Sequence, residues 1–407
     1  MPESTFNGRP TLVVLASTYP RWSGDPEPGF VHELAKRLTD RFHVVALVPS
    51  APGAASREIL DGVEVIRYRY APRRFETLVN DGGIVNNLRR NRWKIFLVPT
   101  FVLAQAWRTW RLLRSRKVDV IHAHWLLPQG LIVALLRQLS RRVPPFLVTS
   151  HGADLFALRG RGLNVLKRFV VRRAASVTVV SEAMRDELAR IGADVGAVDV
   201  QPMGVDLTAR FIPDIATERS RDEILFVGRL VEKKGLRYLI DAMPEILKLH
   251  PAAYLTVAGF GPEDMERQAQ VRSLDLQSKV CFVGAISQSE LPVLYRRAAV
   301  FVAPFVQTPG GDQEGLGLVT VEAAGCGCAV VMSDLPTTRD IFNGGRVHLT
   351  VPRSAKSIAD SVCSVLSRVT IGDEVEARDA LYEKFDWSAV AENYGEILFG
   401  LVDGGER

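Results

Sequence analysis

The sequence predicts an α/β protein of two domains, each built around a parallel sheet. Short apolar runs alternate with longer stretches of helical periodicity, which is the pattern of βαβ units. The alternation stops in the polar segment 208–223 and then starts again. The chain has 407 residues, of which 47% are hydrophobic, and this is sufficient for two hydrophobic cores.

The first half of the chain supplies the elements of one such domain. The strands expected there are 11–16, 43–49, 63–68, 118–121, 145–149 and 176–180. The helices expected between them are 30–39, 129–139, 163–174 and 182–191. Short apolar strands of this kind are typical of a sheet that is buried on both faces.

The second half repeats the pattern. Its expected strands are 224–227, 254–258, 280–283, 300–303 and 329–332. We therefore expect two Rossmann-like domains, 1–205 and 206–385, and a final segment, 386–407, with a helix near 388–399 that can pack on either domain. Ligands of such sheets bind outside the carboxyl ends of the strands, which predicts a site in a cleft between the domains.

Charge is distributed unevenly between the two halves. Residues 1–205 contain 30 Lys and Arg against 17 Asp and Glu, a net charge of +13, whereas the remainder contains 21 against 29, a net charge of −8. The sum is the net charge of +5 of the whole chain. A basic half predicts an anionic partner, such as a membrane surface or a phosphorylated acceptor. Nucleic acid is not expected, because no nucleic-acid-binding motif accompanies the charge.

The N-terminal sequence and the cysteines favour a cytoplasmic protein. The first ten residues are polar and the apolar run 11–16 is short, so no secretory signal is expected. The longest apolar run, 95–107, is too short to cross a bilayer. Four cysteines without metal or redox spacing predict free thiols in a reducing compartment.

Two carboxylates eight positions apart, Glu314 and Glu322, form the most informative motif. A strand-like run precedes them, and two glycines and an apolar run separate them. The order of strand, glycine-rich loop and helix predicts an anion site, because loop amides and a helix N-terminus point at the ligand. Carboxylates that are free to accept hydrogen bonds from hydroxyl groups would complete a site for a phosphorylated sugar.

The spacing of the two carboxylates constrains where the helix begins. On one continuous helix they would lie about 12 Å apart along the axis, too far to contact adjacent groups of a ligand. We therefore expect Glu314 in the loop, a helix start near Gly317, and the amides of Leu318 and Val319 directed at a phosphate. The alternative is a helix-terminal charge with a capping contact.

Two cations follow the strand 224–227. Arg229 and Lys234 lie on the loop that leads into the next helix, where two positive charges suit a pyrophosphate. Each charge-assisted hydrogen bond there would contribute about 1.5–3 kcal/mol. The alternative is solvated surface charge, which is what we expect of the neighbouring Lys233. Gly259 follows the next strand in a turn without the third glycine of a dinucleotide fingerprint, so it either lines the same pocket or is only a turn.

Histidines and a loop mark the first half. His151 follows a strand beside a glycine, where it can hydrogen-bond a sugar hydroxyl or accept a proton. The alternative is a histidine with a structural role only. His122 and His124 are two positions apart on a strand and can face the same side. No cysteine or carboxylate completes a ligand set near them, so we expect no metal site. The loop 17–29, which ends at Gly29, can overhang the cleft.

The segment 86–117 combines basic residues with three tryptophans around an apolar middle. The basic residues are Arg89, Arg90, Arg92, Lys94, Arg108, Arg111, Arg114, Arg116 and Lys117. This composition is typical of a helix pair at a membrane interface, where each basic residue near an anionic leaflet contributes about 1 kcal/mol. The alternative is an ordinary amphipathic helix with a solvated basic face.

Together these residues resemble the retaining glycosyltransferases of the large family 4 type, which have the GT-B fold. The strongest motifs are Glu314-x7-Glu322, Phe226-Val-Gly-Arg-Leu with Lys234, and Ser289-Glu-Leu-Pro-Val-Leu-Tyr295. In the first half, Ala123-His-Trp-Leu-Leu-Pro-Gln-Gly130 and Ser150-His-Gly-Ala-Asp154 look like bacterial members that build exopolysaccharide, O-antigen or other lipid-linked glycans. The loop 24–29 departs from the paired glycines common in the family.

The resemblance implies a nucleotide-diphosphate sugar, linked to UDP or GDP, as the donor in the C-terminal domain. Arg229 and Lys234 would bind its pyrophosphate and stabilise the leaving group. Glu322 would bind the ribose and Glu314 the transferred sugar. His151 would lie beside that sugar. The mechanism implied is front-face displacement through an oxocarbenium-like state, without a metal or cofactor.

The resemblance also places Gly29 near the phosphates, and the segment 283–286, which ends at Ile286, along the base. It further implies that the helix near 388–399, in the segment 386–407, crosses back to the first domain. The expected function is transfer of the sugar to a lipid-linked or glycan acceptor in cell-surface polysaccharide synthesis, in the cytoplasm and in contact with the inner face of the membrane. Two alternatives stay open: an epimerase or hydrolase of the same fold, and a non-catalytic nucleotide-sugar-binding protein. The base, the sugar, the acceptor and the oligomeric state are not fixed by the sequence.

Overall fold

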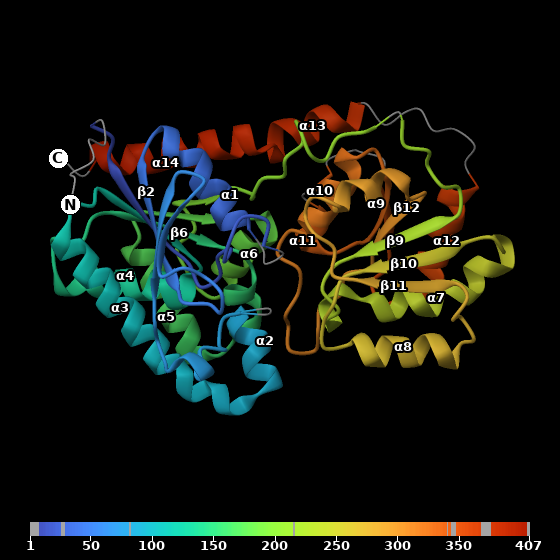
Figure 1. Cartoon of the computed structure of the whole chain (residues 1–407), viewed down its shortest axis with the longest axis horizontal. Coiled ribbons are helices and arrows are strands. Elements are labelled where there is room, and N and C mark those ends of the chain that lie inside the picture. The colour runs from blue at the N-terminus through green and yellow to red at the C-terminus, as the bar shows by residue number, and fades with distance from the viewer. Residues whose placement is uncertain are drawn as a thin grey trace. The chain divides into compact units, whose positions relative to one another are not determined.

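The computed structural model describes residues 8–25, 29–80, 83–214, 216–339, 341–342, 347–367 and 376–404. The chain divides into two compact units: Met1–Gln201 with Val390–Arg407, and Pro202–Ala389. Each unit contains a sheet with helices packed against it (Figure 1). The expected α/β architecture of two parallel-sheet units is therefore confirmed.

The sheet of the first unit has the strand order β3-β4-β2-β1-β5-β6-β7-β8. Its strands are β1 (Thr11–Leu15), β2 (His43–Pro49), β3 (Arg57–Leu60), β4 (Val63–Tyr68), β5 (Val120–His124), β6 (Phe146–Ser150), β7 (Ser176–Val179) and β8 (Val198–Val200). Neighbours are parallel except β3 and β4, which form an antiparallel pair. The connections change direction between β1 and β5, so the loops that leave these two strands lie side by side at the carboxyl edge.

Helices cover this sheet and one of them comes from the end of the chain. The helices within the first 201 residues are α1 (Phe30–Arg37), α2 (Gly83–Arg90), α3 (Leu97–Ser115), α4 (Leu131–Leu139), α5 (Arg161–Arg173) and α6 (Glu182–Arg190). The last helix, α14 (Trp387–Gly404), belongs to the first unit from Val390 onward. Tyr394 on α14 is fully buried, and its hydroxyl donates a hydrogen bond to the carbonyl of Gln201 at 3.0 Å.

The sheet of the second unit is entirely parallel, with the order β11-β10-β9-β12-β13-β14. Its strands are β9 (Glu223–Val227), β10 (Tyr254–Ala258), β11 (Val280–Gly284), β12 (Val300–Ala303), β13 (Ala329–Ser333) and β14 (Val347–Thr350). This is the doubly wound order in which the connections change direction between the first and fourth strands, here β9 and β12. A ligand site is therefore expected where the loops after β9 and β12 meet.

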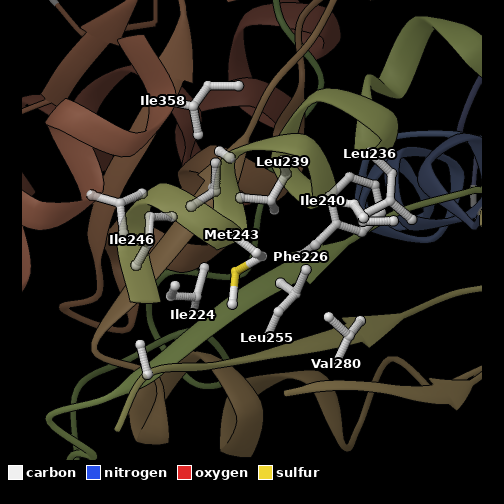
Figure 2. Packing of buried hydrophobic residues seen from close by; sticks show 14 of the residues in the cluster. Ile224, Phe226, Leu236, Leu239, Ile240, Met243, Ile246, Leu255, Val280 and Ile358 are labelled. Carbon is white, nitrogen blue, oxygen red and sulfur yellow. The ribbon is translucent and has the colours of Figure 1, made fainter. Parts of the chain in front are cut away.

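Its helices are α7 (Leu236–Leu249), α8 (Asp264–Ser273), α9 (Leu291–Arg297), α10 (Leu318–Gly325), α11 (Pro336–Arg339), α12 (Ala355–Leu366) and α13 (Glu376–Phe385). The core of the unit lies between the sheet and the helices α7 and α12. Leu236, Leu239, Ile240, Met243 and Ile246 recur at helical spacing along α7 and belong to one buried cluster with residues of the strands and of α12 (Figure 2). This packing fixes the start of α7, and with it the loop that carries the cations.

Several elements differ from those expected. β5 extends to His124, three residues beyond the expected end at 121. The apolar run stops early because His122 and His124 are polar, although both lie inside the buried strand. The short strands β3, β8 and β14 were not expected. The four cysteines are free thiols, as expected. Among the described residues, no helix is both long and apolar enough to span a bilayer.

The packing of α7 predicts a graded response to truncation of its leucines. Leu239→Ala should lower the free energy of unfolding of the second unit by about 2–5 kcal/mol, because Leu239 is fully buried and the cavity does not collapse completely. Leu249→Ala, on the same helix but 71% exposed, should change it by less than about 0.5 kcal/mol. Urea denaturation followed by circular dichroism measures both, and equal effects would contradict the assigned core.

Candidate functional site

The predicted site residues of the second unit gather at the carboxyl edge of its sheet. They come from loops that follow four neighbouring strands and from the first turns of α10. Arg229 and Lys234 follow β9, Gly259 follows β10, Ile286 follows β11, Glu314 follows β12, and Leu318, Val319 and Glu322 lie on α10. Gly29 and His151 belong to the first unit, whose cluster is described below by itself.

The loops after β9 and β12 touch at a glycine. Gly235, the residue before α7, has a φ of +71°, and a Cβ built on it would lie 1.7 Å from the carbonyl oxygen of Pro304. A side chain at this position is therefore excluded twice, by the left-handed backbone and by the neighbouring loop. Gly235 allows the loop of the cations to lie directly against the loop of Glu314.

An ion pair joins the two loops. Lys234 Nζ lies 2.8 Å from Glu314 Oε2, and both side chains are largely buried, at 14% and 17% exposure. The ammonium also lies over the ring of Phe305, 4.8 Å from its centroid, in a cation–π contact. The sequence suggested a free carboxylate at Glu314. In the structure this carboxylate instead forms an ion pair with Lys234 at the same edge of the sheet.

The cations decide the protonation state of Glu314. Burial by itself raises the pKa of this carboxyl, but the charges of Lys234 and Lys233, a hydrogen bond from Lys234 and one from the backbone of Gly315 outweigh it. The net result is a pKa lowered to about 2. Glu314 is therefore ionised throughout the neutral range and can accept hydrogen bonds from hydroxyl groups.

Lys233 is not the solvated residue that the sequence suggested. Its Nζ lies 3.4 Å from Asp312 Oδ1 and donates to the carbonyl of Gln313 at 3.3 Å, and the side chain is only 20% exposed. Asp312 is buried in the loop between β12 and α10. Lys233 therefore ties the tip of this loop to the segment that precedes α7, a second tie beside the pair of Lys234 and Glu314.

Glu322 has a different environment. It is 8% exposed, and its Oε2 accepts a hydrogen bond of 2.9 Å from the hydroxyl of Tyr295 on α9. Burial raises the pKa of Glu322 to about 7, against the opposing effects of the Tyr295 hydrogen bond and the charges of Lys234 and Arg210. One carboxylate of the pair is thus permanently ionised, and the other changes its charge near neutral pH.

The helix that carries Glu322, α10, begins just after Gly317, where the spacing of the two carboxylates predicted its start. Gly317 has a φ of +83° and precedes α10, whose first residues are Leu318 and Val319. A Cβ on Gly317 would lie 2.7 Å from the ring of Phe305, so the turn into the helix requires glycine. The first amides of α10 have no partner within the helix, and with the helix dipole they suit an anion.

Gly259 has a packing role that is independent of any ligand. Its φ is +139°, and a Cβ there would lie 1.9 Å from the carbonyl oxygen of Gly228. The backbone amide of Gly228 in turn donates to the carbonyl of Ala258 at 3.0 Å. The turns after β9 and β10 are therefore in backbone contact, which explains the glycine.

In the first unit, three histidines stack at the carboxyl ends of β5 and β6. The rings of His122 and His124 are 4.0 Å apart, so both do face the same side. His124 Nδ1 and His151 Nε2 share a hydrogen bond of 2.9 Å, with the two rings nearly parallel. Phe30 and Trp125 contact the ring of His151 at centroid distances of 4.8 and 5.2 Å. The sequence did not reveal His124 as the partner of His151.

Burial keeps these histidines neutral. It lowers the pKa of His151 to about 3, and burial together with the neighbouring His151 lowers that of His122 to about 3. The pKa of His124 is lowered too, by burial and by both neighbouring histidines. At neutral pH His151 is thus a neutral hydrogen-bonding group, and a poor acceptor for a full proton transfer.

The loops that carry His151 and Trp125 are tied to each other. Buried Asp154 accepts hydrogen bonds from the amide of Leu126 at 2.7 Å and from the hydroxyl of Ser150 at 2.9 Å. Trp125 has a φ of +77°, a conformation that costs about 1–3 kcal/mol in a residue with a bulky side chain. Such strain is typical of residues held in place for a ligand.

The loop after β1 is anchored by a chain of three side chains. The hydroxyl of Tyr19 and Nδ1 of His32 are 2.7 Å apart, and Nε2 of His32 lies 2.9 Å from Asp61 Oδ2. Gly29 adjoins α1, and a Cβ there would make only an ordinary contact of 3.7 Å with Pro20. Residues 26–28, which contain most of the departure from the family pattern, lie outside the described residues.

The basic segment forms α2, α3 and the short turn between them, and only some of its basic side chains are exposed. Lys94 is buried, where its Nζ donates to the carbonyl of Thr77 at 2.8 Å and to Asn87 Oδ1 at 3.0 Å. Arg116 pairs with Glu64 at 2.8 Å. Arg90, Arg92, Arg108, Arg111 and Arg114 are exposed. Within the part of the chain that the structure describes, no group of three or more His, Cys, Asp or Glu side chains is arranged to hold a metal ion.

Two family models match successive parts of the chain. The model described as Glycosyltransferase Family 4 matches residues 30–209, and the model described as Glycosyl transferases group 1 matches residues 210–383. The two matches divide the chain close to the boundary between its compact units. Both site clusters lie within matched residues.

Curated relatives match over most of their length. An uncharacterized glycosyltransferase of Methanocaldococcus jannaschii is 30% identical over 300 residues, which cover 68% of this chain and 73% of the relative. The glycogen synthase of Mycobacterium tuberculosis is 29% identical, covering 92% and 91%. A phosphatidyl-myo-inositol mannosyltransferase of the same organism is 28% identical, covering 93% of each chain.

Solved structures match in fold. Sucrose-phosphate synthase from Thermosynechococcus elongatus superposes with a TM-score of 0.77 at 22% identity, covering 97% of this chain and 100% of that one. HepE from Anabaena, in complex with UDP and glucose, has a TM-score of 0.71 at 17% identity, covering 96% and 100%. At these identities the likeness shows the fold, which is that of GT-B glycosyltransferases.

The contact of Gly235 with Pro304 predicts an effect on stability. Gly235→Ala should lower the free energy of unfolding of the second unit by the cost of a left-handed residue, about 1–2 kcal/mol, and by about 1–3 kcal/mol more for overpacking. Gly284→Ala, with a φ of +75° and open space around the added Cβ, should show the first cost alone. Urea denaturation of both variants is the measurement, and identical losses would show that the two loops do not touch.

Proposed function

This chain belongs to the glycosyltransferases with the GT-B fold, and we propose that it transfers a sugar, with retention of configuration, from a nucleotide-diphosphate sugar to a lipid-linked or glycan acceptor. The observation that carries the donor proposal is the cluster where β9 and β12 end. Arg229 and Lys234 follow β9, Lys234 pairs with Glu314 on the loop after β12, and that loop leads into α10, which carries Glu322. This combination offers positive charge to a pyrophosphate and acceptors to sugar and ribose hydroxyls.

In the proposed reaction the bond between the anomeric carbon and the donor phosphate breaks, and a bond to the acceptor oxygen forms on the same face of the sugar. The proton of the acceptor hydroxyl passes to the departing diphosphate. Negative charge therefore develops on the diphosphate as the sugar acquires oxocarbenium character. Arg229, Lys234 and the amides of Leu318 and Val319 are the groups proposed to stabilise that charge, without a metal or cofactor.

The ion pair of Lys234 and Glu314 suits both ends of that donor. Glu314 is ionised and can accept hydrogen bonds from hydroxyls of the transferred sugar, while it holds Lys234 in a fixed position. His151 is proposed to contact the same sugar through a hydrogen bond, because its lowered pKa makes it a neutral partner. Gly29 and Ile286 keep the roles that the family resemblance suggests, near the phosphates and along the base. UDP and GDP are the proposed nucleotides.

The proposed acceptor follows from the relatives and from the charge of the first unit. The names of two relatives contain a phosphatidylinositol lipid and a glycan, which supports an acceptor of either class. A net charge of +13 over residues 1–205 would attract the phosphates of a lipid-linked sugar. A role in cell-surface polysaccharide synthesis, in the cytoplasm and on the inner face of the membrane, is part of this proposal.

The solvent face of α3 supports contact with a membrane. Leu97, Phe101 and Leu112 face the core, whereas Leu103 and Trp107, 68% and 57% exposed, lie on the opposite side of the helix. Trp93, Ile95 and Phe96 are also exposed just before α3. The exposed arginines of the same segment flank these apolar side chains. This is the pattern of an interfacial helix on an anionic leaflet.

The donor proposal is tested by removing one of the two cations proposed to stabilise the departing diphosphate. Arg229→Ala should lower kcat about 10²–10³-fold, the loss typical of one charge-stabilising group, without unfolding the protein. The exposed Arg237→Ala, on the neighbouring α7, is the matched control and should retain the wild-type rate. Transfer from UDP- and GDP-sugars is followed by release of the nucleoside diphosphate.

The same assay separates the alternatives. Rapid release of free sugar or an epimer without an acceptor would favour the hydrolase or epimerase. Donor binding without any turnover would favour a binding protein. Wild-type transfer by a folded Arg229→Ala variant would overturn the assignment of the site.

The membrane proposal predicts sedimentation with vesicles. The protein should sediment with vesicles rich in anionic lipid at low ionic strength and be released by high salt, because screening weakens the attraction of the arginines. Leu103→Ser with Trp107→Ser should lower the partition coefficient at least about tenfold, since each buried apolar side chain contributes about 1.5–3 kcal/mol. Leu249→Ser, an exposed leucine of the second unit, is the control. Equal binding to uncharged vesicles would contradict the proposal.

A further inference from the structure

Tyr295 has no role in the site as proposed, although it is the hydrogen-bond partner of Glu322. Its side chain is fully buried, and its hydroxyl donates to Glu322 Oε2 at 2.9 Å. The rings of Phe211 and Phe301 pack against it edge to face, at centroid distances of 6.1 and 5.5 Å. The ring is therefore held by packing, and the hydroxyl meets the carboxylate in one orientation.

We propose that Tyr295 is a positioning residue for donor binding: it holds Glu322 Oε2 and favours the ionised carboxylate that accepts hydrogen bonds from a hydroxyl pair, so that donor affinity depends on the ionisation of Glu322. The inference rests on the proposed function, which assigns Glu322 to a ribose. A ribose offers two adjacent hydroxyl donors. A protonated carboxyl offers them fewer acceptor sites and presents its own O–H instead.

The surroundings of Glu322 make its ionisation sensitive to this single hydrogen bond. Burial disfavours the carboxylate, and Tyr295 on α9, Lys234 before α7 and Arg210 before β9 favour it. Burial and Glu322 raise the pKa of Tyr295 far above its usual range. Cys326 and Cys328, beyond the end of α10, raise the pKa of Tyr295 further. Tyr295 therefore remains a hydrogen-bond donor at every pH at which the protein is studied.

The direction of the pH effect follows from the carboxyl's pKa of about 7. Below that pH the free site is protonated and must lose a proton to bind the hydroxyls, so affinity falls by up to about tenfold per pH unit. Above it the carboxylate is already present and affinity levels off. Donor affinity should thus be about tenfold weaker at pH 6 than at pH 8. Without the Tyr295 hydroxyl, burial raises the pKa further and the same curve moves to higher pH.

The experiment measures the Kd of a nucleotide sugar by calorimetry from pH 6 to 9 for the wild type, Tyr295→Phe and Tyr254→Phe. The intact nucleotide sugar is used because a free nucleoside diphosphate carries a terminal phosphate that itself titrates near pH ~6. Tyr295→Phe should shift the midpoint of the affinity curve to higher pH and approach the wild-type Kd at pH 9. Tyr254 lies at the start of β10, and its variant should reproduce the wild-type curve.

Glu322→Gln provides a second test that does not depend on the fold of the tyrosine variant. Its side chain cannot ionise, so its weaker binding should be independent of pH. A wild-type affinity that is constant from pH 6 to 8, or an unchanged midpoint in folded Tyr295→Phe, would overturn the inference while leaving the donor proposal intact. A wild type that binds no nucleotide sugar at any of these pH values would overturn the proposed function itself.

Discussion

The close approach of the loops after β9 and β12 is the constraint on which the site of the second unit depends. The strand order places these loops side by side, and Gly235 lets them touch without an intervening side chain. Only at this separation does Lys234 reach Glu314 and Lys233 reach Asp312. A larger residue at Gly235 would separate the cations of one loop from the carboxylates of the other. The strand order thus places the two loops side by side, and Gly235 lets them approach closely enough for their charged side chains to pair.

The two glutamates differ in protonation state because their neighbours differ. Glu314 lies against two lysines, and its pKa falls to about 2. Glu322 lies on the following helix, α10, and its hydrogen-bond partner is Tyr295. Burial raises its pKa to about 7. Two carboxylates eight positions apart therefore have different chemistry because their neighbours differ. This difference agrees with the proposal of two separate holding roles for Glu314 and Glu322, which stays a proposal.

Much of this site could be predicted from the sequence, because it follows strand ends. Apolar runs locate β9, β10 and β12 almost to the residue, and the residues after them must lie at the carboxyl edge of a parallel sheet. The spacing of Glu314 and Glu322 places the helix start correctly, since one helix cannot hold both on adjacent ligand groups. The ligand roles of these residues, by contrast, stay predictions.

The partners of these residues could not be predicted, because each comes from a distant part of the chain. Tyr295 precedes Glu322 by 27 positions and His124 precedes His151 by the same number, and neither pair has a local pattern. The ion pair of Lys233 depends on the conformation of a glycine-rich loop, which residue type alone does not specify. Such partners determine whether a side chain is charged: burial keeps His151 neutral beside His124, while Lys234 keeps Glu314 ionised. The sequence therefore identifies the groups that can contact a ligand, whereas the state in which they meet it is a property of the packed structure.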